Sequence, residues 1–253
     1  MKKGEKCVVL NWKTYLSIPD SVEMSRYVVD NYRDFAGRII IAPMHLALHE
    51  VSRVIERKFA LCAQNFDSDL GPHTGGIPIQ VMKDLGCTYA IIGHSEVRYR
   101  EAGEDNDVIG IKVATCVKWG LTPIICFGEK LDERLVDETE DVIEDQIDSA
   151  ISQIGNVSSS HKFIFAYEPV WALSYSKEKR EIDVKEVEKA IQFAKRLLRT
   201  RKFGAKTEFF YGGSVNPSNI TAFFASKEVD GVLVGKASTS RDTIDEIIER
   251  IKP

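Results

Sequence analysis

Eight short apolar runs, each followed by a segment with helical spacing, constrain the fold of this chain more than any other feature. The runs are CVVLN, RIIIAP, FALCAQN, YAIIGH, TPIICFGE, FIFAYEP, EFFYGGS and GVLVG. They are nearly continuous in apolar residues, which is typical of parallel strands buried on both faces. Between them, apolar residues recur on one helical face, most clearly over 142–154, 184–198 and 244–251. The chain therefore alternates strand and helix along its whole length.

This alternation predicts an α/β fold, a closed (β/α)8 barrel with parallel strands and outer helices. A barrel of this kind takes about 250 residues as one domain, and the chain has 253 residues without a low-complexity linker. We expect a single domain over 1–253. The alternative is an open doubly wound sheet, which usually carries a GxGxxG motif after its first strand. This chain has Asn11, Trp12 and Lys13 there instead, which favours the barrel.

The charge and the N-terminal sequence limit the classes of partner. The formal net charge is −4, so no electrostatic argument favours nucleic acid or an anionic membrane. The apolar run near the N-terminus is too short for a signal peptide, which needs about 7–15 apolar residues. It is also too short for a membrane helix of about 20 residues. We expect a cytoplasmic protein.

The cysteines point to the same compartment. There are five, an odd number, and none lies in a CxxC or a Cys/His cluster with metal-ligand spacing. Cys7, Cys62 and Cys126 lie within strand-like runs. We expect reduced, buried thiols and no metal site.

Polar residues gather where the predicted strands end, and a barrel carries its active site at the C-terminal ends of its strands. Those residues are Asn11 and Lys13 after the first strand, Gln64 and Asn65 after the third, His94 to Glu96 after the fourth, Glu168 after the sixth, Tyr211 to Ser214 after the seventh, and Gly235 and Lys236 after the eighth. One polar strand end means little by itself. Convergence from six strands on one face predicts a functional site.

Three of these side chains form a set suited to proton transfer. Taken alone, Glu168 reads as a solvated strand-end carboxylate, His94 as a structural histidine and Lys13 as a surface lysine. Apolar residues on both sides of Glu168 favour a dry site, which raises the pKa of a carboxylate and makes it a stronger base. His94 directly precedes a predicted helix start, a position that favours a neutral imidazole. Lys13 would supply fixed positive charge in the mouth of the barrel.

Two glycine turns, Gly212-Gly213-Ser214 and Gly235-Lys236, follow the last two strands. Barrels often build a phosphate site from these two loops, because glycine lets backbone N–H groups approach an anion closely. We therefore expect a small phosphorylated substrate. A carboxylate base with a neutral imidazole and a lysine can move a proton beside a carbonyl and so interconvert a ketose and an aldose. These residues do not identify the substrate.

Seven motifs, in order and over almost the full length, resemble the triosephosphate isomerase family. They are NWK (Asn11 to Lys13), AQN (Ala63 to Asn65), IIGHSE (Ile91 to Glu96), CFGE (Cys126 to Glu129), AYEPVWA (Ala166 to Ala172), YGGS (Tyr211 to Ser214) and GVLVG (Gly231 to Gly235). The resemblance implies a TIM barrel and a cofactor-independent isomerase of glycolysis and gluconeogenesis. Such an enzyme interconverts dihydroxyacetone phosphate and glyceraldehyde 3-phosphate.

The resemblance also implies roles for individual residues. Glu168 would be the base, His94 the electrophile, and Asn11 and Lys13 substrate and charge contacts. The backbone N–H groups expected to hold the phosphate belong to Ser174, Ser214, Gly235 and Lys236, with Glu96, Cys126 and Tyr211 in supporting positions. Family members are usually homodimers, and residues 71–76 (GPHTGG) resemble the loop that enters the partner, with Thr74 reaching its site.

The chain departs from the family in the loop after Glu168, where Ser174 and Ser176 replace two glycines around Tyr175. It also has Lys236 in place of a second glycine after the last strand, Val97 in place of an arginine, and Gly76 in place of a glutamate. Two other functions stay open from the sequence. One is a sister isomerase of a four-carbon ketose phosphate, and the other is a non-catalytic barrel that binds sugar phosphates.

Overall fold

Eight parallel strands close into a barrel in the order β1-β2-β3-β4-β5-β6-β7-β8. The computed structural model describes residues 6–67, 71–101, 103–173 and 180–252. The strands are β1 (Cys7–Asn11), β2 (Arg38–Ala42), β3 (Ala60–Ala63), β4 (Cys87–Ile92), β5 (Thr122–Phe127), β6 (Lys162–Tyr167), β7 (Lys206–Tyr211) and β8 (Gly231–Val234). Each predicted strand is present, and the predicted (β/α)8 barrel is confirmed.

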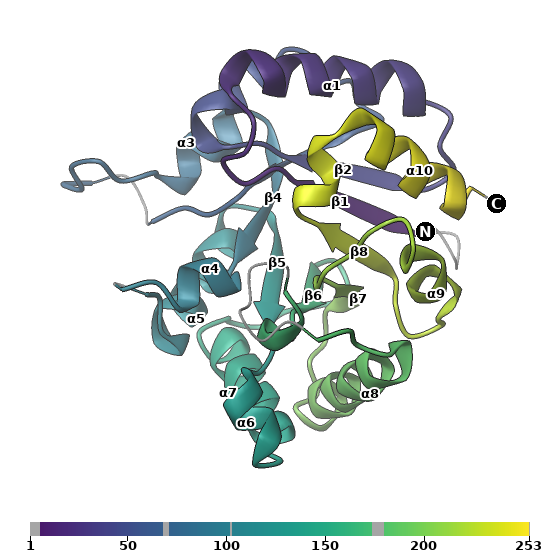
Figure 1. The fold of residues 1–253 in the computed structure, drawn as a ribbon. Helices are drawn as coiled ribbons and strands as arrows, with labels where there is room; N and C mark the ends of the chain where they lie inside the picture. Colours follow the sequence, from purple (N-terminus) through teal and green to yellow (C-terminus); the bar gives the residue numbers. More distant parts are fainter. Residues whose placement is uncertain (1–5, 68–70, 102, 174–179, 253) are drawn as a thin grey trace.

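The helices form a ring outside the strands, as Figure 1 shows. They are α1 (Ile18–Tyr32), α2 (Leu48–Ser52), α3 (Ile79–Asp84), α4 (Ser95–Arg98), α5 (Asn106–Lys118), α6 (Leu131–Leu135), α7 (Thr139–Ser152), α8 (Val184–Thr200), α9 (Ile220–Ala225) and α10 (Arg241–Ile251). Short 3-10 helices cover His45–Ala47, Val170–Ala172 and Lys236–Thr239. Among the described residues, no helix combines the length and the apolarity that crossing a bilayer would require.

Side-chain oxygens at the helix starts explain where several helices begin. Asp105 accepts a hydrogen bond from the Val108 backbone N–H at 2.9 Å and begins α5. Asp183 accepts from the Lys185 N–H at 2.8 Å and begins α8. Ser17 accepts from the Asp20 N–H at 3.3 Å and begins α1. Each cap satisfies a backbone donor that has no partner within its helix.

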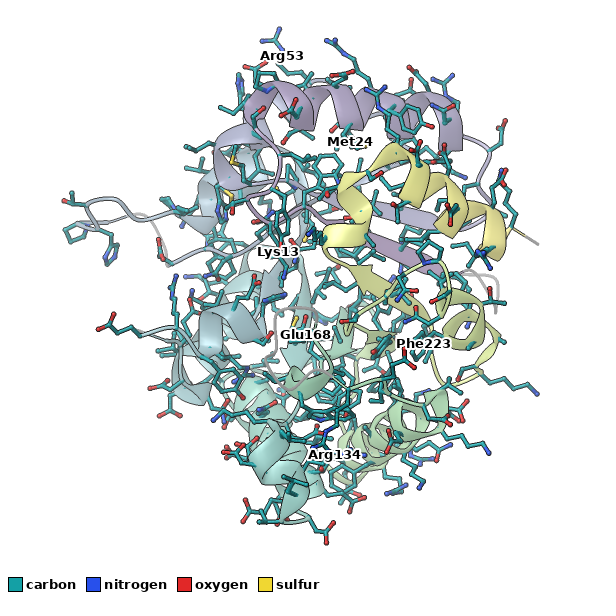
Figure 2. All side chains as sticks on the ribbon, in the orientation of Figure 1. Lys13, Met24, Arg53, Arg134, Glu168 and Phe223 are labelled. Atoms are coloured by element: carbon teal, nitrogen blue, oxygen red, sulfur yellow. The ribbon has the colours of Figure 1, made fainter. Side chains whose placement is uncertain are left out.

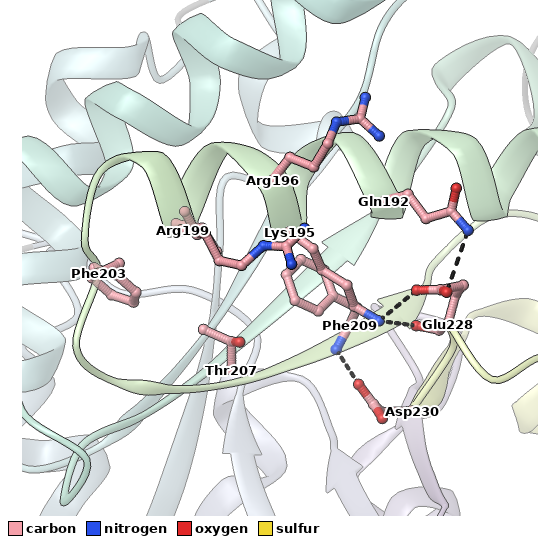
Figure 3. A pocket seen from close by; sticks show the side chains of 10 residues that line it. Gln192, Lys195, Arg196, Arg199, Phe203, Thr207, Phe209, Glu228 and Asp230 are labelled. Atoms are coloured by element: carbon pink, nitrogen blue, oxygen red, sulfur yellow. Dashed lines mark hydrogen bonds and ion pairs between the residues drawn. The ribbon is translucent and has the colours of Figure 1, made fainter.

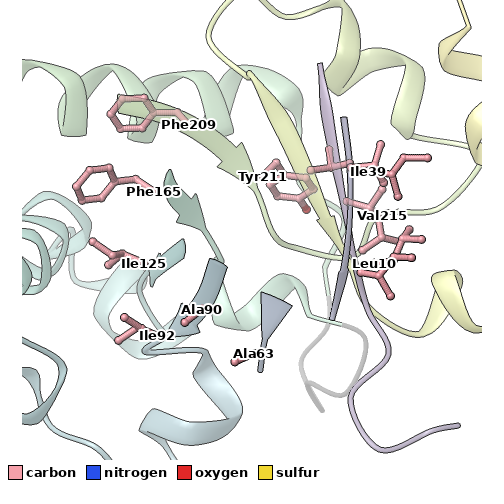
Figure 4. Packing of buried hydrophobic residues seen from close by; sticks show 14 of the residues in the cluster. Leu10, Ile39, Ala63, Ala90, Ile92, Ile125, Phe165, Phe209, Tyr211 and Val215 are labelled. Carbon is pink, nitrogen blue, oxygen red and sulfur yellow. The ribbon is translucent and has the colours of Figure 1, made fainter. Parts of the chain in front are cut away.

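Strand residues alternate between two buried layers, because successive side chains point to opposite faces of a sheet. One layer fills the barrel and includes Val9, Ile40, Ile91, Ile124, Ile164, Phe210 and Leu233. The other packs under the helices, and Figure 4 shows part of it: Leu10, Ile39, Ile92, Ile125, Phe165, Phe209 and Tyr211. All eight strands contribute to both layers, which is why their sequences are nearly continuous in apolar residues.

The first and last parts of the chain are joined twice. β1 pairs with β8 in parallel, with Val9 opposite Leu233, and this pairing closes the barrel. Outside it, Asp245 of α10 accepts hydrogen bonds from the hydroxyls of Tyr27 and Tyr32 of α1. Tyr32 is buried, so Asp245 supplies its hydroxyl with a partner in place of water.

We predict that Asp245→Ala lowers the free energy of unfolding by about 1–3 kcal/mol, because it removes the carboxylate that accepts from the hydroxyls of Tyr27 and of the buried Tyr32. Urea denaturation measures this change. Glu246→Ala is the matched control, since Glu246 is the exposed next residue on the same helix. Equal effects of the two substitutions would contradict the prediction.

Candidate active site

The inward-facing layer of the barrel continues past the strand ends into the mouth. On β6, Ile164 and Ala166 face the barrel interior, and two residues later the same face carries Glu168. On β1, Asn11 follows Val9 by the same alternation and is buried. The period of two in a strand therefore delivers these polar side chains to the mouth. Lys13 and Glu168 both lie near the centre of the ring of helices in Figure 2.

Glu168 is 2% exposed and sits between strands β5 and β7. Its backbone N–H donates to the Phe127 carbonyl at 2.7 Å. Its Oε2 accepts from the Ser95 backbone N–H at 3.2 Å, while Oε1 lies 3.3 Å from His94 Nε2. Burial raises the pKa of Glu168 to about 7, against the lowering effects of Ser95 and Lys13. The carboxylate is a stronger base than an exposed one and is still ionised above neutral pH.

His94 places the Nε2 of its ring 3.3 Å from Glu168 Oε1. It is 5% exposed and caps α4, where its Nδ1 accepts from the Glu96 backbone N–H at 3.2 Å. That bond leaves the proton on Nε2, the nitrogen nearest Glu168. Burial, followed by the charge of Lys13, lowers the pKa of His94 to about 4. Both causes favour the neutral imidazole that the sequence predicts, and burial is the larger of the two.

Lys13 is held in the mouth by its backbone and by Glu96. Its φ is 49°, in the left-handed region that costs a non-glycine residue roughly 1–2 kcal/mol. The Gln64 amide donates to the Lys13 carbonyl at 2.8 Å and to the Ala42 carbonyl at 2.9 Å. The Lys13 ammonium donates to Glu96 Oε1 at 2.7 Å. Gln64 thus fixes the backbone from which the lysine projects, a role that the sequence alone did not show.

Two glycines make room for Glu168. A Cβ on Gly212 would lie 2.7 Å from Glu168 Cγ, and one on Gly128 would lie 2.2 Å from the Glu168 carbonyl oxygen. A Cβ on Gly213 would similarly lie 2.2 Å from the Tyr211 hydroxyl. The sequence predicts that the turn after β7 binds an anion. The structure adds that Gly212 and Gly213 are required for packing around Glu168 and Tyr211.

The carboxylate of Glu129, which follows β5, contacts the segment around Glu168 and the helix α6. It is 0% exposed and accepts hydrogen bonds from Trp171 Nε1 at 2.8 Å and from the Tyr167 hydroxyl at 3.0 Å. Arg134 Nη1 lies 3.5 Å away and offsets its charge. Glu129 therefore anchors the segment that follows Glu168. The motif CFGE contains this residue, but its buried partners are distant in sequence.

Arg98 joins the ends of β4 and β5. Its Nε donates to the Gly93 carbonyl at 2.8 Å and its Nη2 donates to the Cys126 carbonyl at 3.2 Å. Cys126 is fully buried, next to Glu168 in the inward layer, and burial raises the pKa of its thiol. All five cysteines are buried and free, as predicted.

A cavity of about 410 Å³ opens beside these groups. Its lining includes Lys13, His94, Gly212, Gly213, Ser214, Gly235 and Lys236. Three of the four residues expected to hold phosphate thus line the same cavity as Lys13 and His94. These three are Ser214, Gly235 and Lys236. The fourth, Ser174, lies outside the described residues. The Ser214 hydroxyl donates to the Ala172 carbonyl at 2.7 Å.

A larger cavity of about 670 Å³ lies away from this site, between α8 and the N-terminal ends of β7 and β8 (Figure 3). Several of its polar groups are paired with one another. Lys195 contacts Glu228 at 2.9 Å, and Asp230 accepts from the Phe209 N–H at 2.8 Å. The 410 Å³ cavity, which is lined by Lys13, His94 and the glycine turns after β7 and β8, is therefore the candidate active site.

Residues 71–76 contribute nothing to the lining of the 410 Å³ cavity. Thr74 is exposed, and the segment that contains it projects away from the barrel at the left of Figure 1. A second cavity of about 340 Å³ beside the mouth is lined by Asn11, Lys13, His45, Gln64, Glu96 and Arg100. Within the described part of the chain, no group of three or more His, Cys, Asp and Glu side chains is placed to hold a metal ion.

Comparison with known proteins identifies the family. A family model described as triosephosphate isomerase matches residues 6–251. The triosephosphate isomerase of Chlorobaculum tepidum is 36% identical over 96% of this chain and 99% of its own length. That of Dictyoglomus thermophilum is 34% identical over 96% and 98%, and that of Shewanella sp. ANA-3 is 36% identical over 90% of each. The barrel with a buried glutamate and a neutral histidine at its mouth therefore belongs to the triosephosphate isomerase family.

Proposed function

We propose that the chain interconverts dihydroxyacetone phosphate and D-glyceraldehyde 3-phosphate in glycolysis and gluconeogenesis, and that Glu168 is the base that moves the proton. Family membership makes the chain an aldose–ketose isomerase. The observation that supports the assignment of the base is the carboxylate of Glu168, which is 2% exposed and lies 3.3 Å from the ring nitrogen of His94.

The reaction follows from the placement of the two groups. The Glu168 carboxylate removes a proton from the carbon beside the substrate carbonyl, and the electron pair moves onto the carbonyl oxygen. The Nε2–H of His94 donates a hydrogen bond to this oxygen, and the Lys13 ammonium stabilises the charge that develops on it. The proton of the adjacent hydroxyl group then moves to the former carbonyl oxygen. Glu168 returns its proton to the former carbonyl carbon, the adjacent carbon becomes the new carbonyl, and an aldose becomes a ketose or the reverse. Asn11, whose side chain accepts from the Lys13 N–H at 3.1 Å, lies beside the substrate oxygens.

The two pKa values suit these roles at neutral pH. A base is most effective when its pKa lies near the working pH, because it is then both deprotonated and strongly basic. Glu168, with a pKa of about 7, meets this condition. His94, with a pKa of about 4, is uncharged there and can donate without first losing a proton.

The alternatives have less support. A barrel that only bound sugar phosphates would gain nothing from a carboxylate buried at a free-energy cost beside its ligand. For a four-carbon substrate, the described site offers no specific feature. The loop 174–179, where the sequence departs most from the family, lies outside the described residues.

We further propose a cytoplasmic homodimer. The projecting segment around Thr74 and the 340 Å³ cavity beside the mouth are complementary features of one chain, and a second copy would bring them together. In that arrangement Thr74 of one subunit contacts the groups around Lys13 and Glu96 of the other. The five buried free thiols suit a reducing compartment.

We predict that Glu168→Gln lowers kcat for glyceraldehyde 3-phosphate by about 100- to 10,000-fold, the usual contribution of a general base. Binding of inorganic phosphate should be unchanged. A coupled spectrophotometric assay and a phosphate titration measure the two quantities. Glu246→Gln, on the exposed face of α10, is the charge-matched control and should keep full activity. Normal turnover in Glu168→Gln would exclude Glu168 as the base.

We predict that kcat/KM rises with pH to a plateau above about 7, because only the ionised form of Glu168 removes a proton. A phosphate ester also ionises, near pH 6. The profile should therefore be measured with both glyceraldehyde 3-phosphate and unphosphorylated D-glyceraldehyde. The same inflection with both substrates supports Glu168. A flat profile between pH 5 and 8 with D-glyceraldehyde would contradict the assignment.

We predict that the protein sediments as a dimer, with twice the chain mass of 28.5 kDa. Thr74→Arg should shift it toward the monomer and reduce activity, because a long charged side chain would not fit into the partner. Ser160→Arg, an equal change at an exposed residue before β6, controls for the added charge. A wild-type monomer with full activity would refute the proposed dimer.

A further inference from the structure

Four ionisable side chains at the mouth of the barrel together give no net attraction to an anion. They are Lys13, Glu96, His94 and Glu168. The Lys13 ammonium is paired with Glu96 at 2.7 Å, so their charges cancel. His94 is neutral and Glu168 is anionic above its pKa of about 7. The chain as a whole has a net charge of −4. A phosphate monoester, with a charge of about −1.5 to −2 at pH 7, would meet no net positive charge from these groups.

Lys236 differs from Lys13, the other lysine in the described lining of the 410 Å³ cavity, because it forms no ion pair with the described residues. It directly follows Gly235 at the end of β8 and begins the 3-10 helix Lys236–Thr239. It is exposed and lines the 410 Å³ cavity together with Lys13 and His94. Within the described residues, its ammonium makes no hydrogen bond or ion pair, and none of the residues that line this cavity is acidic. Its charge is therefore not cancelled locally.

Lys236 lies on the side of the cavity where the glycine turns lie, directly after Gly235. Lys13 approaches the same turn, since a Cβ on Gly235 would be 3.5 Å from Lys13 Cε and 3.9 Å from its Nζ. The other groups on this side include the hydroxyl-bearing Ser214, Thr239, Ser240 and Thr243. An anion here would have neutral hydrogen-bonding groups and one uncancelled ammonium around it.

We propose that the charge of Lys236 strengthens the binding of phosphorylated substrates, by attracting the phosphate group into this cavity. The inference rests on the proposed function and adds a binding residue to it, without a part in the proton transfer. An exposed ammonium is screened by salt, since the Debye length is about 10 Å at 0.1 M and about 3 Å at 1 M. The attraction should therefore be strong in dilute buffer and weak at high ionic strength.

The test compares Lys236→Ala with wild type in binding of inorganic phosphate, which requires no turnover. At low ionic strength, the Kd for phosphate should rise about three- to tenfold, and the difference should shrink at about 1 M salt. Lys236→Arg should keep the wild-type affinity, because it keeps the charge. Lys227→Ala is the matched control: it removes an exposed lysine before β8, at the opposite end of the barrel.

Kinetics provide the second readout. Lys236→Ala should lower kcat/KM for glyceraldehyde 3-phosphate by a similar factor at low salt and leave that for unphosphorylated D-glyceraldehyde unchanged. An equal loss of kcat/KM with both substrates would indicate a structural role for Lys236 and overturn the proposal. So would phosphate binding that is unaffected by Lys236→Ala, or a wild-type protein that binds no phosphate. A wild-type protein that binds phosphate through Lys236 but turns over no triose phosphate would refute the proposed reaction and leave this inference standing.

Discussion

Closing a parallel sheet into a barrel buries both faces of every strand, and the rest of the structure depends on this constraint. One face must fill the interior and the other must pack under helices, so side chains alternate strictly between two apolar layers. The alternation does not stop where the strands end. It carries Asn11, Gln64 and Glu168 onward from the inward layer to the mouth, into surroundings that the barrel has already made dry. The active site is thus a continuation of the core with polar side chains.

Desolvation in this mouth acts in opposite directions on its two main groups. It disfavours the charged form of each, so it raises the pKa of Glu168 and lowers that of His94. A single environment therefore produces a stronger base and a neutral donor side by side. Lys13 adds to the lowering of the His94 pKa but opposes the raising of the Glu168 pKa, and its own charge is balanced by Glu96. This balance leaves the attraction of an anionic substrate to other groups, including the backbone and Lys236.

The eight strands, the barrel and the convergence of Lys13, His94 and Glu168 could be predicted from the sequence, because each depends on local periodicity or on the position of a strand end. Contacts between strands could not. The need for glycine at positions 128 and 212 depends on how closely β5 and β7 approach Glu168 on β6. The links from Gln64 to Lys13 and from Glu129 to Trp171 join segments that are far apart in sequence. For the same reason, burial proved to be the main cause of the neutral His94, where the sequence showed only a helix start.

The burial of Glu168 also links the protonation of its carboxylate to the stability of the fold. Its pKa is 4.5 when exposed and about 7 in the folded chain, so between these values the folded state binds a proton that the unfolded state has released. Stability therefore falls as pH rises from about 4.5 to 7, and ionising this one carboxylate costs the fold roughly 3 kcal/mol. In the proposed reaction, the same ionisation creates the active base. Over this range, the protonated form of Glu168 that stabilises the fold is then the form that cannot catalyse, and each gain in activity with rising pH is accompanied by a loss of conformational stability.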